Sequence, residues 1–367
     1  MSDATAELQP GLNQELWDSS VAFVDWCNEQ GGINGRKIEL TKLESKLFDA
    51  QQVAIAACES EFMLVGGGAA FDDQVVPERL KCGLPAVPAY NATKVATEAE
   101  LNFPPLPTPF DVLAAGEAFH LAEEYPEAVK KAGSLAPNFV SAKNIAIRAK
   151  AAYTAAGWEF IDDELYNPAG EANWTGIVTS LKSAGVEALF YTGTYEPMVA
   201  FLKAAAEQNW KPQLIIGTST IYNDSFLTEA GADADGTYSY TNIAPFDEAE
   251  PGSATAKYIE ILDTYANAKP ALMGADSMSA WLLWATAAKA CGSDLTRQCV
   301  EDQILSTTEW TAGGLHAPSN PSKGNAGQPS CYLIVEASGS EWKRSYPESG
   351  FDCNEKYLVS TAAAPYE

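Results

Sequence analysis

A run of small residues, Gly66-Gly67-Gly68-Ala69-Ala70, lies between an apolar strand-like segment and a predicted helix. In a parallel sheet this turn falls at the carboxyl edge of the strands, where ligands bind. The N–H groups of a glycine turn and a helix start suit a carboxylate or a phosphate. The alternative is a tight turn that only needs small residues. The run matches neither G-x-G-x-x-G with a following acidic residue nor a P-loop, so it does not indicate a dinucleotide or a triphosphate.

Four other strand-to-helix loops share an aromatic and neutral polar content. This content is typical of a small-molecule site with few orienting hydrogen bonds, although each side chain taken alone also fits an exposed loop. Because the carboxyl ends of parallel strands meet at one edge of a sheet, the loops are stronger evidence together than singly. The candidate ligand-binding residues in these loops are Tyr90, Asn91, Asn138, Ser141, Thr194, Tyr195, Ser219 and Tyr222.

Residues for catalysis or for metal binding are scarce. The chain has two histidines, His120 and His316, which are too few for a His-rich metal site. A Ser-His-Asp triad would have to use one of them, and no G-x-S-x-G elbow is present. The carboxylate cluster Asp162-Asp163-Glu164 is typical of a solvated surface in a chain this acidic. We therefore expect no cofactor, no metal and no enzymatic activity, and an α/β enzyme is the weakest of the alternatives.

The elements that must position these loops alternate between helix and strand, which predicts an α/β fold with a parallel sheet. A cluster of four prolines between residues 104 and 109 interrupts the alternation and favours a crossing between domains there. Helices are predicted over 12–29, 49–58, 73–82, 111–124, 140–156, 174–184, 197–208, 253–267, 276–290 and 295–305. Strands are predicted over 38–41, 62–65, 84–87, 129–136, 158–165, 188–192 and 214–216, with a hairpin from 332–336 to 342–345.

Length and charge exclude several classes of protein. The 367 residues suggest about two domains. The net charge of −26 argues against nucleic acid and anionic lipid as partners, because both need clustered Lys and Arg. No stretch approaches the roughly 20 apolar residues of a membrane helix, so we expect no direct membrane insertion.

Six of the seven cysteines fall into three close pairs, with none of the spacing of a zinc or redox site. We predict disulfides Cys58–Cys82, Cys291–Cys299 and Cys331–Cys353, with Cys27 as a buried free thiol. Such bonds indicate an oxidising compartment and therefore an exported protein. Residues 1–10 carry no signal-peptide pattern, so we expect the targeting segment to be absent from this chain.

The segment from Asn28 to Leu40, NEQGGINGRKIEL, resembles the N-E-x-G-G-I-N-G-R-K-I-x-L signature of type I periplasmic binding proteins. More narrowly, it is similar to the leucine/isoleucine/valine-binding branch of ABC-transporter substrate-binding proteins. The resemblance covers the chain from about residue 11. Further matches are Phe62 to Gly67, Gly83 to Pro88, Leu165 to Ala169, Ala188 to Pro197 and Ile215 to Phe226.

This resemblance implies two Rossmann-like lobes that are joined by a three-crossing hinge and close on a ligand. The lobes would comprise 1–110 with 246–318, and 111–245 with 319–367. Family members carry a first strand before the first helix, whereas only ten polar residues precede that helix here. We therefore expect the first strand to be missing because the chain is truncated at its N-terminus.

The resemblance also implies a function. The chain would be an extracytoplasmic receptor, periplasmic or at the cell surface, that captures a small metabolite and delivers it to the membrane permease of an ABC importer. It would act as a monomer without cofactor, and a lipid anchor in the full-length protein is left open. The alternative within the same fold is a ligand-sensing receptor or regulator domain.

The predicted pocket departs from the amino-acid pattern of the family. Ala69-Ala70 stand where family members place a serine for the ligand carboxylate, and Tyr90-Asn91 stand where a threonine follows the next strand. The family's acidic residue for the ligand ammonium group falls near Ser219, whereas Tyr195 matches a family tyrosine that packs on the ligand. An ammonium ion without a carboxylate partner is costly to bury. We expect a larger, less zwitterionic ligand, such as an aromatic or amide-bearing compound.

Overall fold

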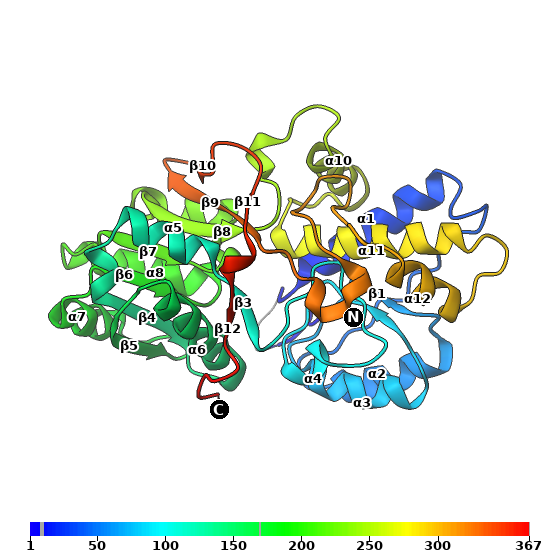
Figure 1. Ribbon diagram of the computed structural model, residues 1–367, viewed down its shortest axis with the longest axis horizontal. Coiled ribbons are helices and arrows are strands. Elements are labelled where there is room, and N and C mark those ends of the chain that lie inside the picture. The colour runs from blue at the N-terminus through cyan, green and yellow to red at the C-terminus, as the bar shows by residue number, and fades with distance from the viewer. Residues whose placement is uncertain (8–10, 169, 367) are drawn as a thin grey trace. The chain divides into compact units, whose positions relative to one another are not determined.

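The computed structural model describes residues 1–7, 11–168 and 170–366, which form two compact units (Figure 1). Unit 1 comprises Met1–Phe110 with Ile243–Pro329, and unit 2 comprises Asp111–Asn242 with Ser330–Glu367. The chain therefore passes between the units three times, after residues 110, 242 and 329. The crossings predicted from the sequence follow residues 110, 245 and 318.

Unit 1 is predominantly helical around a very short parallel sheet. Side chains cap some of its helices: the Ser253 hydroxyl accepts from the Ala256 N–H at the start of α10, and the Thr296 hydroxyl accepts from the Cys299 N–H at the start of α12. The α-helices are α1 (Gln14–Glu29), α2 (Ala50–Ser60), α3 (Asp72–Lys81), α4 (Lys94–Thr97), α10 (Ala254–Ala266), α11 (Leu272–Ala290) and α12 (Arg297–Leu305). The strands are β1 (Leu64–Val65) and β2 (Ala86–Val87), and 3-10 helices span Phe246–Glu248 and Pro321–Gly327.

The strand predicted over residues 38–41 is wrong. The segment forms no regular strand, and only Glu44, further on, makes a parallel bridge, with Ser2. A strand needs a neighbouring backbone, and here a hollow of about 500 Å³, counting its open side, lies between residues 39–43 and β1. Alternating side chains predict the extended conformation of a segment but not the presence of a partner for it.

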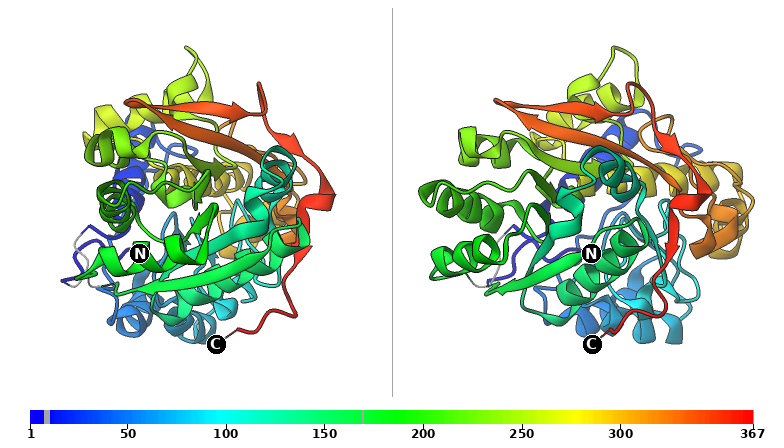
Figure 2. Two further views of the ribbon diagram at one scale, coloured as in Figure 1. Left: turned by 90° about the vertical axis from the view of Figure 1, so that its left-hand side faces the viewer. Right: turned by 60° about the vertical axis from the view of Figure 1, so that its left-hand side comes forward.

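Unit 2 is built on a long mixed sheet in the order β10-β9-β8-β7-β6-β4-β5, with β11 also paired to β9. The pairs from β5 to β8 are parallel, whereas β9 is antiparallel to its neighbours. The β9–β10 hairpin is seen in orange-red in Figure 2. The strands are β3 (Val112–Ala114), β4 (Ala132–Pro137), β5 (Phe160–Tyr166), β6 (Ala188–Tyr191), β7 (Leu214–Gly217), β8 (Thr237–Thr241), β9 (Cys331–Ser338), β10 (Glu341–Tyr346), β11 (Asp352–Cys353) and β12 (Leu358–Ser360).

Helices cover both faces of this sheet. Phe190 and its neighbours pack with Tyr153 of α6 on one face, whereas Gly133 faces Leu181 of α7 on the other. Strands β4, β6 and β7 are buried along their whole length, as expected for parallel strands in a helix-covered sheet. The helices of unit 2 are α5 (Gly116–Glu124), α6 (Val140–Ala155), α7 (Trp174–Ala184), α8 (Tyr195–Glu207) and α9 (Asp224–Ala230), with 3-10 helices at Ala128–Lys131, Ser219–Ile221, Gly231–Ala234 and Glu355–Tyr357.

Three disulfides are present, and they are the three predicted pairs. Cys58–Cys82 joins the ends of α2 and α3, Cys291–Cys299 joins α11 to α12, and Cys331–Cys353 joins directly opposed residues of β9 and β11. Cys27 is a buried free thiol, as predicted. Each disulfide closes a short loop between neighbouring elements of one unit, so its effect on stability is local to that unit.

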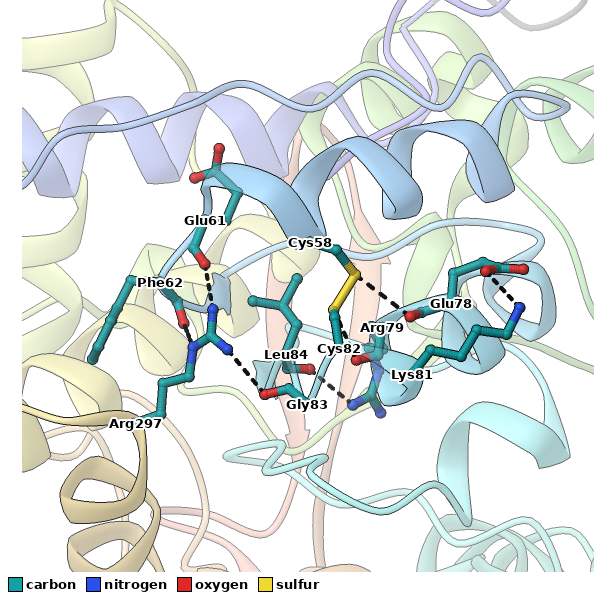
Figure 3. Close-up of a disulfide and its surroundings, with 10 residues drawn as sticks. All are labelled: Cys58, Glu61, Phe62, Glu78, Arg79, Lys81, Cys82, Gly83, Leu84 and Arg297. Atoms are coloured by element: carbon teal, nitrogen blue, oxygen red, sulfur yellow. Dashed lines mark hydrogen bonds and ion pairs between the residues drawn. A yellow bond between two sulfur atoms is a disulfide. The ribbon is translucent and has the colours of Figure 1, made fainter.

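Arg297 of α12 binds the same corner of unit 1 as the first disulfide (Figure 3). Its guanidinium donates to the carbonyl oxygens of Glu61 (2.7 Å), Phe62 (2.7 Å) and Gly83 (3.2 Å). These carbonyls lie just beyond the C-terminal ends of α2 and α3, where helices leave acceptors unsatisfied and where a cation is favourable. Arg297 thus connects the two chain segments of unit 1, Ile243–Pro329 and Met1–Phe110.

We expect Arg297→Ala to lower the free energy of unfolding of unit 1 by about 2 kcal/mol, because three charge-assisted hydrogen bonds to backbone carbonyls are lost. Arg36→Ala is the matched control, since the exposed side chain of Arg36 donates to the single carbonyl of Ser293. It should cost less than about 0.5 kcal/mol. Urea denaturation followed by circular dichroism measures both, and equal losses would show that the three-carbonyl contact adds nothing.

His316 lies in the core of unit 1 with 1% of its surface exposed. Its Nδ1 donates to the Ala317 carbonyl (2.7 Å), and its Nε2 lies 2.8 Å from the Ser279 hydroxyl. Burial lowers the pKa of the imidazole to about 4, so the ring is neutral in the folded protein at pH 7.

Because the folded pKa of His316 lies below the ordinary value of 6.5, the unfolded chain binds the proton more tightly. This residue therefore lowers the stability as the pH falls from about 6.5 to about 4, by roughly 3 kcal/mol in total. The difference in unfolding free energy between the native protein and His316→Gln should follow that curve, measured by urea denaturation at several pH values. A difference that does not change with pH would contradict the burial of a neutral ring.

Candidate ligand-binding site

The two loops after β1 and β2 lie side by side because the two strands are parallel and their last residues, Val65 and Val87, are paired. Beyond the ladder, the Gly66 N–H donates to the Val87 carbonyl (2.9 Å), and the Ala89 N–H donates to the Gly67 carbonyl (2.8 Å). The pairing thus extends past the last strand residues and holds the two loops together. We refer to residues 66–71 and 88–93 as the first loop cluster.

Two positions of this cluster require glycine because a side chain there would collide with a neighbouring aromatic ring. Gly66 has a φ of +67°, and a side chain there would collide with the Trp281 indole. A Cβ at Gly68 would collide with the Tyr90 ring. The run of small residues therefore allows two aromatic side chains to lie directly against the loop backbone. The sequence was compatible with either a structural or a ligand-binding role for these small residues, and this packing is a structural role.

The N–H groups of the loop are largely used within the protein. The Gly68 N–H donates to the Met1 carbonyl (3.1 Å), and the Ala70 N–H donates to Oδ2 of Asp3 (2.9 Å). These two groups are therefore not free to bind a carboxylate or a phosphate in this structure. The glycine turn therefore does not offer these two N–H groups to a ligand, because a backbone carbonyl and the Asp3 carboxylate already accept from them.

Asp3 is the organising residue of this loop. Its side chain is fully buried, and its other oxygen accepts from the Ser45 hydroxyl and the Leu47 N–H, both at 2.7 Å. The carboxylate thus joins three segments that are far apart in the chain. No sequence signal identified Asp3, because one acidic residue in a polar segment is typical of solvent-exposed surface.

The second loop of the cluster is held by two further side chains. The carboxylate of Asp72 accepts from the Ala92 N–H (2.6 Å) and from the N–H (3.2 Å) and hydroxyl (2.6 Å) of Thr93. Burial raises the pKa of Asp72 to about 6. The Tyr90 hydroxyl accepts from the Asn13 amide at 2.8 Å. The backbone and the aromatic ring of this loop therefore have fixed positions.

A pocket of about 450 Å³, counting its open mouth, lies beside the first loop cluster. Five of the predicted site residues line it, and they are Gly67, Gly68, Ala69, Tyr90 and Asn91. Apolar residues from α3, β2 and α4 form much of the remaining wall, and Arg79 and Asn102 add polar groups. Its mostly apolar lining with a few polar groups is typical of a small-molecule site. Ala70 belongs to the same loop but does not line the pocket.

In unit 2, residues 138–141, 192–195 and 218–223 form the second loop cluster, at the carboxyl ends of β4, β6 and β7. Tyr166 and Tyr191 stack with their hydroxyl oxygens 2.9 Å apart, and the Tyr191 hydroxyl donates to the Thr194 carbonyl (2.7 Å). A side chain at Gly193 would collide with both hydroxyls. The Thr220 hydroxyl donates to the Gly193 carbonyl at 2.6 Å. Neutral hydroxyl groups therefore fix this loop.

The predicted aromatic residues of the second loop cluster have different environments. Tyr195 opens α8 half-buried, and its hydroxyl lies 3.4 Å from a carboxylate oxygen of Glu229. Tyr222 is 3% exposed and packs edge-on against the Trp342 ring, so it belongs to the core of unit 2. Sequence reasoning could not separate the two, because both are tyrosines next to a strand end.

The predicted polar residues of this cluster are less enclosed. Asn138 is exposed, and Thr194 and Ser219 are half-buried. The side chain of Ser141 lies outside what the structure describes. Ser219 begins a 3-10 helix rather than an α-helix, so it offers no extended helix N-terminus to an anion. These residues remain proposed ligand contacts.

Two further properties of the structure concern metal binding and membrane insertion. Within residues 1–7, 11–168 and 170–366, no group of three or more His, Cys, Asp or Glu side chains is placed to hold a metal ion. Among the same residues, no helix has the length and hydropathy needed to cross a membrane.

The sequence profile of the periplasmic binding proteins matches residues 9–341. No curated protein sequence matches this chain significantly. The family and the solved structures that resemble the chain are substrate-binding proteins, which are not enzymes.

Several solved structures share the fold at low sequence identity. The branched-chain amino acid transporter substrate-binding protein LivJ from Streptococcus pneumoniae, in complex with isoleucine, has a TM-score of 0.73 at 16% identity, covering 95% of this chain and 94% of that one. A solute-binding protein of an ABC transporter from Rhodopseudomonas palustris, in complex with 3,4-dihydroxybenzoic acid, has a TM-score of 0.74 at 14% identity, covering 96% and 94%. A fatty acid ABC transporter substrate-binding protein from Thermomonospora curvata has a TM-score of 0.74 at 14% identity, covering 94% and 89%.

We expect Gly68→Ala to displace the Tyr90 ring and to weaken its hydrogen bond with Asn13, lowering the unfolding free energy by about 1–2 kcal/mol. Gly176→Ala is the matched control, because a Cβ in α7 would meet nothing closer than 3.7 Å. It should be neutral or stabilise by up to about 1 kcal/mol. Thermal and urea denaturation measure both, and a Gly68→Ala protein as stable as the control would contradict the packing of Tyr90 against the loop.

Proposed function

The chain belongs to the periplasmic binding protein family, and we propose that it is an extracytoplasmic receptor that captures a small metabolite for an ABC importer. Its partners would be the metabolite and the membrane permease of that importer, and it would act as a monomer without a cofactor.

The observation that carries this proposal is the pocket beside the first loop cluster. Gly67, Gly68, Ala69, Tyr90 and Asn91, which come from two loops, line one pocket. These residues offer an aromatic face, a side-chain amide and closely approachable backbone, but no nucleophile or general base. Such a lining supports capture of a ligand rather than its chemical conversion.

The residues also support a restriction on the ligand. In the family pattern an acidic residue near position 219 meets the ligand's ammonium group, and here Ser219 is flanked by Thr218 and Thr220, whose hydroxyls bond to each other at 2.9 Å. An ammonium group beside them would lose its counter-charge. We propose an amino-acid-like, amide or aromatic compound that is less zwitterionic than a branched-chain amino acid. The similar solved structures include complexes with isoleucine and with 3,4-dihydroxybenzoic acid and the substrate-binding protein of a fatty acid transporter, which is compatible with such variety within one fold.

A thermal-shift screen of amino acids, aromatic acids, amides and short peptides tests the proposal. A true ligand at a hundredfold excess over Kd should stabilise the protein by about 2.7 kcal/mol and raise its Tm. Gly68→Ala should lose most of that rise, and Gly176→Ala should keep it. We expect the largest rise with an aromatic or amide-bearing compound rather than with leucine, isoleucine or valine.

Two outcomes would count against the proposal in different ways. If none of the compounds raises the Tm of the full chain, capture of a small metabolite is contradicted. If leucine, isoleucine or valine gives the largest rise, the receptor function stands but the proposed ligand class is wrong.

A further inference from the structure

Arg79 of α3 lies in the pocket wall with only 2% of its surface exposed. Its Nη1 donates to the carbonyl oxygens of Leu101 (3.0 Å) and, at a long 3.4 Å, Leu84, and Figure 3 shows the second contact. Its Nη2 is buried and has no hydrogen-bond partner among the described residues. Because a buried donor without a partner costs free energy, this nitrogen calls for an acceptor.

The charge of Arg79 is also incompletely balanced. Asp72 is the other charged side chain that lines the pocket, but its oxygens already accept from Ala92 and Thr93. In the described part of the chain, no carboxylate oxygen lies within 4.0 Å of the guanidinium. Burial lowers the pKa of Arg79 to about 10, and Asp72 opposes that shift only in part. At neutral pH the arginine is therefore a buried cation without a bonded anion.

The other residues that line the pocket indicate what kind of ligand could reach the Arg79 cation. Besides Arg79, the pocket is lined by the apolar residues Val75, Val76, Ala86, Pro88 and Ala96 and by the Tyr90 ring. Asn91 and Asn102 are the neutral polar side chains there. The lining matches a compact apolar or aromatic body with one anionic end.

We propose that the pocket binds an organic acid whose carboxylate accepts a hydrogen bond from Nη2 of Arg79, with the apolar body of the acid against Val75, Val76 and Tyr90. This assignment rests on the proposed receptor function and narrows its ligand class to acids that lack an ammonium group. Such a group would have only the occupied carboxylate of Asp72 to meet. Recognition of the acid thus comes from a side chain beneath the loops, not from the N–H groups of the loops.

Calorimetric titration of the full chain with matched pairs of probes tests this. The pairs are benzoate with benzamide and 3-methylbutanoate with 3-methylbutanamide, which differ in charge but hardly in shape. At least one acid should bind about 10- to 100-fold more tightly than its amide, as expected for a charge-assisted hydrogen bond. Arg79→Met should abolish that preference, whereas Arg36→Met, at an exposed arginine of unit 1, should leave it unchanged.

Asp72→Asn is an independent test in the opposite direction, because it removes a negative charge near Arg79 instead of the positive charge of Arg79 itself. Because Asp72 also holds the second loop, its substitution can change the binding of both compounds. Removing the nearby negative charge should nevertheless raise the ratio of acid affinity to amide affinity several-fold, a change of ratio that loss of structure cannot produce. If Arg79→Met does not fold, the acid-to-amide ratio of the native protein and its change in Asp72→Asn decide the question.

The proposal is overturned if acid and amide bind equally, if a folded Arg79→Met keeps the preference, or if Asp72→Asn lowers the ratio of acid affinity to amide affinity. It is also overturned, with the receptor function intact, if compounds other than acids raise the Tm and neither acid binds. If no compound of any class binds, the receptor function itself fails.

Discussion

The buried carboxylate of Asp3 is the interaction on which the binding surface of unit 1 depends. It accepts hydrogen bonds from the Ser45 hydroxyl, the Leu47 N–H and the Ala70 N–H, and so holds the loop after β1 in place. A buried carboxylate is stable only when its oxygens are satisfied in this way. The consequence is that part of the loop backbone is already paired with an anion. In the proposed function, a ligand would then be recognised by the side chains around the loop, which are the Tyr90 ring, the Asn91 amide and the guanidinium of Arg79.

The second loop cluster reaches a similar result by different chemistry. The Tyr191 hydroxyl, which is hydrogen-bonded to the Tyr166 hydroxyl, donates to the Thr194 carbonyl, and the Thr220 hydroxyl donates to the Gly193 carbonyl. The groups that fix these loops are neutral, although the chain carries a net charge of −26.

The sequence predicted the regular elements well because their patterns are local. The helix predicted over 12–29 is observed at Gln14–Glu29, and the strand predicted over 188–192 is observed at Ala188–Tyr191. The cysteine pairs were predictable for the same reason, since each joins neighbouring elements. The segment over 38–41 failed because a strand depends on a partner that no local pattern encodes.

The site was predictable only as a set of loops. Strand-to-helix order placed Gly68 and Tyr90 at one edge, but it could not show that the loop N–H groups are occupied by a remote side chain, Asp3. Arg79 was equally hidden, because an arginine among the charged residues of a short helix is typical of an exposed position. Its burial is a property of the packed unit. Tyr222 shows the converse, since a tyrosine predicted for the site lies in the core.

A high-resolution crystal structure with the tightest-binding compound of the screen is the most direct test. It shows whether the ligand is recognised by side chains or by the N–H groups of the first loop cluster. We predict ligand density in the pocket of the first loop cluster, an acidic oxygen within hydrogen-bond distance of Nη2 of Arg79, and the Ala70 N–H still bonded to Asp3. A ligand held by the N–H groups of residues 67–70, with the Asp3 carboxylate displaced, would contradict the account.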